Sequence, residues 1–354
     1  MFRLLIKKLA YSVLVLAGVV VVVFFVFQAF GDPARMVLGQ TGDKQTMDNI
    51  RKELYLDQPK WKQFIFYVND ISPVAIHSEK DIKEKGLRGF FIGGTKPDSY
   101  RIGIKVPYLR RSYQTKKPVT EVLSEALPGT IMLACAAMFF AVIVGIFLGI
   151  LAAVNQNTWM DTSSVFASVI GISAPSFFMA IVIAYLFGLV LHDYTGLPLT
   201  GSWFNIDQVT GKRYLTLQNL ILPALTLGIR PLSIITQLTR SSMLDTLNQD
   251  YIRTAYAKGL SKRKVVYGHA LRNAINPVLT AITGWFAELL AGAFFVEYIF
   301  GWKGIGKVTV DALEKLDYPV VMGSVLFAAT IFVLINILAD VLYGIIDPRV
   351  KMNS

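Results

Sequence analysis

The amino-acid sequence predicts an all-α integral membrane protein with six transmembrane helices. Of its 354 residues, 54% are hydrophobic and only 17% are charged, whereas soluble domains carry about 25% charged residues. Apolar runs of the length that crosses a bilayer, about 20 residues, recur along the chain. Basic residues gather between some of these runs, as the positive-inside rule describes for cytoplasmic loops.

The first predicted span is the run of residues 9–30, which contains no charged residue and follows Arg3, Lys7 and Lys8. A cleaved signal peptide is the alternative, but its apolar region would be about 7–15 residues long and would end at a small-residue cleavage site. This run is longer, and no A-x-A sequence follows it. We therefore expect an uncleaved membrane anchor with its N-terminus in the cytoplasm.

Five further spans are predicted from the remaining apolar runs: residues 128–154, 162–191, about 217–238, about 276–300 and 320–346. Asp161 or Thr162 is expected to cap the third span by accepting hydrogen bonds from free backbone N–H groups. Pro175 lies in the middle of that span and should kink it. An even number of crossings puts both termini on the same side.

Loop charge predicts the orientation. Residues 239–275, between the fourth and fifth spans, contain seven Lys or Arg against two Asp, and Arg349 and Lys351 follow the sixth span. The positive-inside rule makes both segments cytoplasmic. Residues 31–117 are then external. They are also net basic, but the rule weakens beyond about 60 residues, and we expect a small external subdomain that is partly strand.

Composition limits the other classes of function. The net charge of +11 would favour nucleic acid in a soluble protein, but here it fits a positive-inside bias and attraction to anionic lipid. We expect membrane lipid, and no nucleic acid, as a partner. Cys135 is the only cysteine, the three histidines lie far apart, and no HExxH or GxSxG spacing occurs. We expect no catalytic residue, no metal and no cofactor.

Residues 301–307 imitate a P-loop, with the G-x4-G-K spacing. The residue after Lys307 is Val308, where a P-loop needs Ser or Thr to bind Mg²⁺, and an apolar run rather than a strand precedes the motif. The segment also falls on the external side, where there is no ATP. A glycine-rich turn between helices explains it better than nucleotide binding.

The cytoplasmic loop contains the most informative pattern. Residues 248–273 indicate a short helix, Gly259 as its C-terminal glycine, and a second helix that Ser261 would cap. One interpretation is a solvated basic loop that touches lipid headgroups. The other is a short helix that docks on a soluble partner. Periodicity alone leaves both open.

This loop resembles the EAA loop of binding-protein-dependent ABC permeases, whose glycine matches Gly259. The chain is most similar to the B-type permease subunit of the oligopeptide/dipeptide/nickel ABC importer family. The run 240–277 carries most of the resemblance, and further matches are residues 31–34 (GDPA), 56–59 (LDQP), 118–128 (PVTEVLSEALP), 174–177 (APSF), 222–228 (LPALTLG), 317–320 (DYPV) and 347–349 (DPR).

The resemblance implies the type I ABC importer permease fold in a bacterial inner membrane. Its domains would be an N-terminal helix (1–30), an external subdomain (31–117) and a permease domain (118–348). The implied partners are a homologous second permease, two ATP-binding subunits and an extracytoplasmic solute-binding protein. ATP would be hydrolysed by the partners, so the chain is not an enzyme. The residues implied to couple hydrolysis to transport are Arg253, Thr254, Ala255, Tyr256, Lys258, Gly259 and Leu260.

The chain departs from the family pattern in three places. Residues 71–107 are longer than the usual link, the Gly-Asp-Leu-Gly segment before residue 118 is replaced by residues 108–112, and Arg230 and Glu288 occupy predicted spans. The resemblance implies transport of di- or oligopeptides, with nickel or glutathione as alternatives. A stand-alone secondary transporter remains a further alternative, although it often shows inverted repeats, and we find no internal repeat. An intramembrane enzyme lacks any supporting spacing.

Arg230 and Glu288 are the charges deepest in the predicted membrane region. At 1.5 Å per residue, their backbones would differ in depth by only about 8 Å within a core about 30 Å thick. A charge there costs about 2.5–3.5 kcal/mol on insertion scales, so such residues tend to pair or to face a water-filled cavity. We expect the two to pair or to line the translocation path. The alternative is that one of them snorkels, or that each bonds separately to a backbone carbonyl or water.

Overall fold

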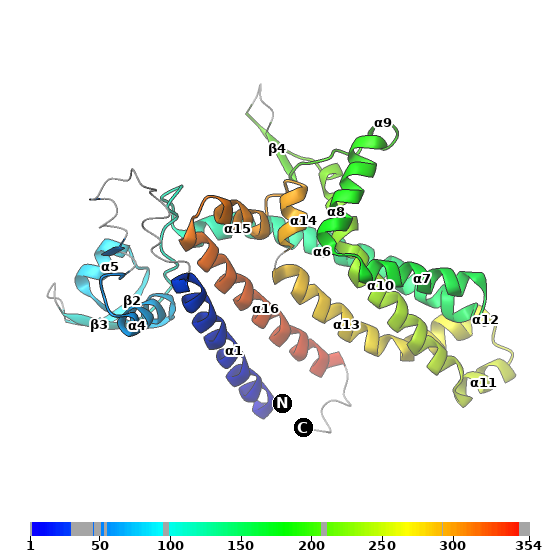
Figure 1. Ribbon diagram of the computed structural model, residues 1–354. Helices are drawn as coiled ribbons and strands as arrows, with labels where there is room; N and C mark the ends of the chain where they lie inside the picture. The colour runs from blue at the N-terminus through cyan, green and yellow to red at the C-terminus, as the bar shows by residue number, and fades with distance from the viewer. Residues whose placement is uncertain are drawn as a thin grey trace. The chain divides into compact units, whose positions relative to one another are not determined.

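The computed structural model describes residues 2–29, 45, 51–52, 55–94, 99–206, 211–291 and 293–346, and these residues are mostly helical (Figure 1). They divide into two compact units. Unit 1 comprises Met1–Glu125 and Val308–Thr330, and unit 2 comprises Ala126–Lys307 and Ile331–Ser354. The matched segments 31–34 and 347–349, and the basic tail with Arg349 and Lys351, lie outside the described residues.

Five of the six predicted spans coincide with helices that are long and apolar enough to cross a membrane. These helices are α1 (Phe2–Ala29), α6 (Val119–Val154), α10 (Gln218–Leu247), α13 (Leu271–Ala291) and α16 (Tyr318–Ile346). Each helix covers most of its predicted span, but α1 and α6 begin earlier, α10 ends later, and α13 begins and ends earlier than predicted. These helices therefore confirm the helical membrane fold that the apolar runs predict.

The third predicted span is not one helix. It is divided into α7 (Trp159–Ser173) and α8 (Ser176–Tyr185), which continues as the π-helical segment η2 (Leu186–Val190), and the two parts are bent by 108°. Ala174 precedes proline and is extended, with ψ of 129°, because the proline ring disfavours helical backbone at that residue. Pro175 thus breaks the span, which is a larger effect than the predicted kink.

The predicted caps are also corrected. The N-cap of α7 is Thr158, whose φ and ψ are −101° and 172°, so Asp161 and Thr162 lie within the first turn. The Asp161 carboxylate still accepts a hydrogen bond from the backbone N–H of Asn157 at 3.0 Å.

The fifth predicted span ends earlier than expected: α13 stops at Ala291, and a separate helix α14 (Phe294–Ile299) follows.

The part of unit 1 that follows α1 contains both helix and sheet, which agrees with the partly stranded subdomain expected there. Strands β1 (Val74–Ser78), β3 (Tyr100–Lys105) and β2 (Gly89–Gly93) form an antiparallel sheet in the order β1-β3-β2. Helix α4 (Lys60–Ile71) precedes β1, and α5 (Glu79–Lys85) follows it.

Polar groups form much of the interior of this subdomain. Asp70 on α4 is 1% exposed, and its carboxylate accepts a hydrogen bond from Lys85 Nζ at 2.7 Å. Lys105 Nζ on β3 donates to the Asp70 carbonyl. His77 on β1 is also buried, and Asn69 approaches its ring nitrogen at 3.5 Å. Burial and the nearby Lys85 and Lys105 ammonium groups lower the pKa of His77.

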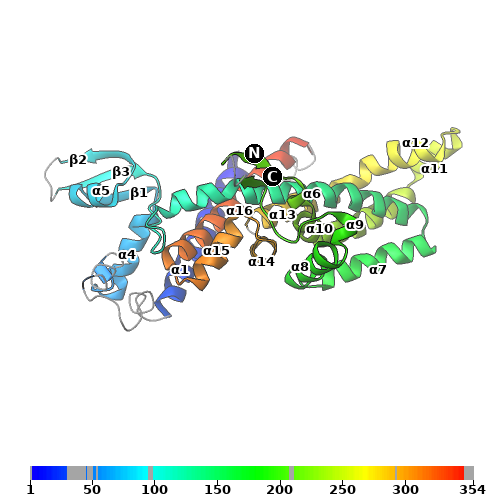
Figure 2. The same ribbon diagram turned by 90° about the horizontal axis from the view of Figure 1, so that it is seen from above.

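Unit 2 is built on α10, which contacts α7, α8 and α13 (Figure 2). Small residues allow the close approach: a Cβ added to Gly149 on α6 would meet Thr239 of α10, and one added to Gly171 on α7 would meet Ser233 of α10. Small residues at helix interfaces are typical of membrane bundles, where packing drives association. Unit 2 also contains α9 (His192–Thr195), the hairpin of β4 (Phe204–Ile206) with β5 (Arg213–Leu215), and the start of α15 (Ile305–Glu314).

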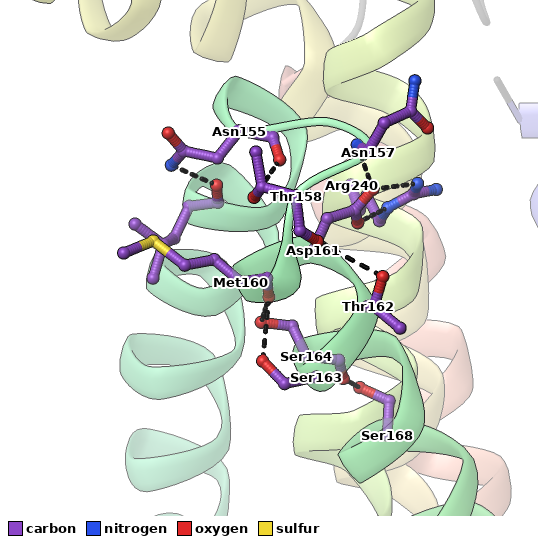
Figure 3. Close-up of polar contacts among 11 residues, drawn as sticks. Asn155, Asn157, Thr158, Met160, Asp161, Thr162, Ser163, Ser164, Ser168 and Arg240 are labelled. Atoms are coloured by element: carbon purple, nitrogen blue, oxygen red, sulfur yellow. Dashed lines mark hydrogen bonds and ion pairs between the residues drawn. The ribbon is translucent and has the colours of Figure 1, made fainter.

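A bidentate ion pair between Asp161 and Arg240 joins the start of α7 to α10 (Figure 3). Arg240 donates from Nε to Asp161 Oδ1 at 2.5 Å and from Nη2 to Asp161 Oδ2 at 2.8 Å. The Asp161 side chain is 6% exposed and that of Arg240 is 26% exposed. Bidentate pairs of this kind fix geometry as well as adding energy, so the pair sets the angle at which α7 leaves its turn.

We predict that Asp161→Asn lowers the melting temperature of the purified protein in detergent. The substitution removes the charge from a paired carboxylate whose hydrogen bonds to a charged partner are worth about 1.5–3 kcal/mol, and the partial exposure of Arg240 puts the loss at the lower end. Glu84→Gln is the matched control, because the Lys80–Glu84 pair is exposed and such pairs contribute about 0–1 kcal/mol. Equal melting temperatures for the two variants would contradict the prediction.

A second prediction concerns pH. The folded His77 has a pKa below the 6.5 of an unfolded histidine, so the unfolded state binds more protons between the two values and stability falls as pH drops through that window. The protection factors of amides in β1 and β3, which are exchange rates corrected for the intrinsic rate at each pH, should fall between about pH 7.5 and about pH 5. His77→Gln should reduce this fall, and an unchanged fall would rule out His77 as its source.

Candidate functional site

The predicted cytoplasmic loop 239–275 is mostly helical. Helix α10 continues to Leu247, α11 (Asp250–Ala257) follows, and α12 (Lys262–Lys264) runs through the π-helical segment η3 (Val265–Ala270) into α13 without a break. Non-helical backbone is confined to residues 248–249 and 258–261. The figures show α11 and α12 side by side at one end of the helices of unit 2 (Figures 1 and 2).

Gly259 occupies the position that its residue type predicts. It follows the C-cap residue Lys258 of α11 and has a φ of +75°, a left-handed conformation that costs glycine nothing and strains other residues. Ser261 stands at the N-cap of α12, but its side chain makes no capping hydrogen bond. The turn between the two helices is therefore closed by Gly259 and not by the serine hydroxyl.

Helix α11 is anchored through one face. Ile252 and Ala255, three residues apart, are 1% and 6% exposed. They belong to a hydrophobic cluster, here called the anchor cluster, which joins α11 to α6, α10, η3 and α13. Its buried members are Ile150, Ala153, Met243, Ile252, Ala255, Val265, Val266, Ala270 and Ala274.

The opposite face of α11 and the following turn are open to solvent. Of the seven residues that the family resemblance implied, five are exposed: Arg253, Thr254, Tyr256, Lys258 and Gly259. Ala255 is buried in the anchor cluster, and Leu260 is half-buried against it. These two hold the helix in place and do not present a surface. The resemblance alone could not distinguish buried from exposed residues, because exposure depends on which face of α11 packs into the anchor cluster.

The exposed face is basic and aromatic. Arg253 contacts Asp250 at 3.5 Å, but both side chains are more than three-quarters exposed, so that pair fixes little. Tyr251 is held by a hydrogen bond from Asn273 at 3.0 Å. Lys262, Arg263 and Lys264 lie just beyond the turn and are exposed. A small anchored helix with such a face can press on a partner without bending.

The P-loop-like segment 301–307 connects α14 to α15, which agrees with the glycine-rich turn expected from the sequence. It curls around the carboxyl group of Glu297, which is 0% exposed. Glu297 accepts hydrogen bonds from Thr130 Oγ1 at 2.8 Å and from the backbone N–H of Lys307 at 3.1 Å. The carboxyl group occupies the space beside Gly304, where a Cβ would collide with it. Sequence reasoning missed Glu297; its one signal was an acid near the end of the predicted span 276–300.

Arg230 and Glu288 line the same cavity, which has a volume of about 160 Å³. The predicted ion pair between them is absent: among the described residues, neither side chain has a partner of opposite charge within 4.0 Å. The guanidinium carbon of Arg230 lies instead 5.4 Å from the centre of the Trp285 ring. The alternative half of the hypothesis, that the two line a path, stays a prediction.

Comparison with known proteins identifies the family. Residues 145–352 match the model of the binding-protein-dependent transport system inner membrane component, and residues 1–134 match the N-terminal model of the same systems. The chain is similar to a dipeptide transport system permease protein of Alkalihalophilus pseudofirmus, with 35% identity over 98% of each chain. It has 34% identity to the dipeptide permease of Escherichia coli K12, over 99% of each chain.

Two further similarities complete the comparison. A glutathione transport system permease protein of Salmonella choleraesuis is 35% identical over 99% of each chain. The inward-facing MetNI methionine ABC transporter superposes with a TM-score of 0.50, at 16% identity over 64% of this chain and 97% of that chain, which shows the fold. The chain is a permease subunit of an ABC importer, which works with partner subunits and is not an enzyme. With an anchored helix in its basic loop and several membrane-length helices, this multi-pass chain belongs to the family of binding-protein-dependent transport system inner membrane components.

Proposed function

We propose that the chain forms half of a translocation pathway for di- or oligopeptides in a bacterial inner membrane. Its partners are a homologous second permease, two ATP-binding subunits and an extracytoplasmic solute-binding protein. The exposed face of α11, fixed by Ile252 and Ala255 in the anchor cluster, carries the proposal. Similarity over nearly the whole chain to proteins that are named dipeptide permeases supports a peptide as the substrate.

The mechanism that this arrangement supports is rigid transmission. When the ATP-binding subunits close on ATP, they push on Arg253, Thr254, Tyr256, Lys258 and Gly259. Because α11 shares the anchor cluster with α6, α10 and α13, the push moves those helices together and not the loop alone. Alternating access needs two packings of similar energy, and the close helix contacts at Gly149 and Gly171 suit sliding without large side chains in the way.

A glutathione permease is the second candidate. The 35% identical relative from Salmonella choleraesuis favours it, and glutathione is itself a small peptide with free carboxylates and an ammonium group. Uptake of labelled dipeptide and labelled glutathione by the same reconstituted complex, with its own binding protein, separates the two. A nickel importer is the outcome if neither is taken up and chelated nickel is.

The proposed domain limits are an N-terminal helix (1–30), an external subdomain (31–117) and a permease domain (118–348), with both termini in the cytoplasm. Cysteines placed at Ser78 and Ser261 should then react with a membrane-impermeant maleimide from opposite sides in oriented vesicles, after Cys135→Ser. Ser78 lies in β1 and Ser261 beside α12. Labelling of both from one side would reject the proposed orientation.

The coupling role is tested at the turn after α11. Gly259→Asp places a side chain on a backbone with φ of +75° and adds a negative charge to a basic face. We expect ATP-dependent uptake to fall at least about tenfold, equivalent to about 1.4 kcal/mol, and the ATP-binding subunits to co-purify less with the membrane subunits. Deletion of residues 254–256 should have the same effect.

The control for this experiment is Gly196→Asp. Gly196 also has a positive φ, of +64°, and a Cβ there meets nothing within 4 Å, but it lies after α9, away from α11 in sequence and outside the anchor cluster. Equal losses in both variants would assign the defect to backbone strain. Normal co-purification and uptake in Gly259→Asp would reject the docking role.

A further inference from the structure

The break in the third predicted span opens onto the cavity that contains Arg230 and Glu288. Gly171 and Ala174, from the end of α7, line it together with Ser176 at the start of α8. Helices α10, α13 and α14 supply the remaining walls. All of these residues belong to unit 2. Discontinuous helices around a central site are a recurring way to bind small charged solutes within a membrane.

Two opposite charges face this cavity without neutralising each other. Arg230 and Glu288 are both exposed, and among the described residues neither forms an ion pair. Arg230 lies over Trp285, one turn before Glu288 on α13. The aromatic ring holds the guanidinium by a cation–π contact, which positions the charge and leaves its hydrogen-bond donors available. Full charges within a membrane span are costly, and they are characteristic of solute pathways.

The start of α8 adds a second group for an anion. This helix is ten residues long, its N-cap is Pro175, and no side chain caps its free N–H groups. A helix N-terminus carries a partial positive charge and is suited to carboxylates. Ser176, its first residue, lines the same cavity as Arg230. The cavity thus offers two groups for a carboxylate and one carboxylate for a cation.

We propose that this cavity is a transient site for a zwitterionic peptide, in which Arg230 and the start of α8 receive the terminal carboxylate and Glu288 receives the terminal ammonium. The proposal rests on the proposed peptide-transport function and specifies the substrate class: short peptides with both termini free. A cavity of about 160 Å³ is smaller than the sites of about 300–1,000 Å³ that hold drug-sized ligands. It therefore suits one or two residues at a time.

The test uses the complete complex in proteoliposomes, with ATP inside and labelled Ala-Ala loaded at saturation onto the binding protein. Arg230→Gln and Glu288→Gln should each reduce uptake about tenfold, while ATPase stimulation by the loaded binding protein is retained. Fewer peptides then cross per ATP hydrolysed. Arg230→Lys keeps the charge but loses the planar guanidinium, so its uptake of Ala-Ala should lie between those of the wild type and of Arg230→Gln. The lysine variant also tests the proposal if the glutamine variant fails to assemble.

Matched controls remove one exposed charge elsewhere. Arg88→Gln and Glu84→Gln affect side chains on the surface of unit 1 and should leave uptake per ATP unchanged. A C-terminally amidated Ala-Ala serves as the second substrate. Arg230→Gln should reduce uptake of free Ala-Ala more than uptake of the amide, because only the free peptide presents a carboxylate to the missing guanidinium.

The double variant Arg230→Met with Glu288→Leu removes both charges and tests whether they serve transport or assembly. It should assemble and still import poorly. Full recovery of uptake, or equal effects of Arg230→Gln on both peptides, would overturn the zwitterion site while wild-type import continued to support the proposed function. A wild-type complex that hydrolyses ATP without importing Ala-Ala would overturn both.

Discussion

The packing of Ile252 and Ala255 into the anchor cluster is the contact on which the rest of the functional arrangement depends. Without it, α11 would be a short amphipathic helix on a loop, and eight residues are too few for a stable isolated helix. With this packing, α11 belongs to the same hydrophobic cluster as residues of α6, α10 and α13. Force applied to the exposed basic face is then carried by close-packed side chains, which transmit displacement because protein interiors have low compressibility.

Charge is handled in two different ways within unit 2. Asp161 and Arg240 satisfy each other through two hydrogen bonds, which fasten α7 to α10. Arg230 and Glu288 face a cavity and do not meet. A satisfied pair stabilises one arrangement, whereas separated charges leave interaction energy available to a solute of complementary charge. An arginine of α10 therefore serves structure at Arg240 and, in our proposal, recognition at Arg230.

Glu297 shows how a glycine-rich motif can be misread. The spacing of Gly301, Gly306 and Lys307 is that of a phosphate-binding loop, but the loop encloses a carboxyl group of its own chain. Gly304 and Gly306 are required because any Cβ there would collide with Glu297 or with the backbone of Phe294. The glycines therefore serve close packing around a buried acid. Thr130 of α6 donates a hydrogen bond to Glu297, and Trp302 donates one to the Gly129 carbonyl of α6.

The sequence by itself determined the membrane class, the number and approximate limits of the apolar runs, and the helix–glycine–helix pattern at Gly259, because hydrophobicity and backbone preference are local properties. Tertiary structure decided the rest. The bend of 108° at Pro175 is a tertiary property, because a proline disfavours helical backbone at the residue before it but does not set the angle at which the next helix leaves. The buried position of Ala255 depended on which face of α11 packs into the anchor cluster. The separation of Arg230 from Glu288 depended on side-chain directions that depth along two helices cannot give, since residues at equal depth can still point to different sides of a cavity.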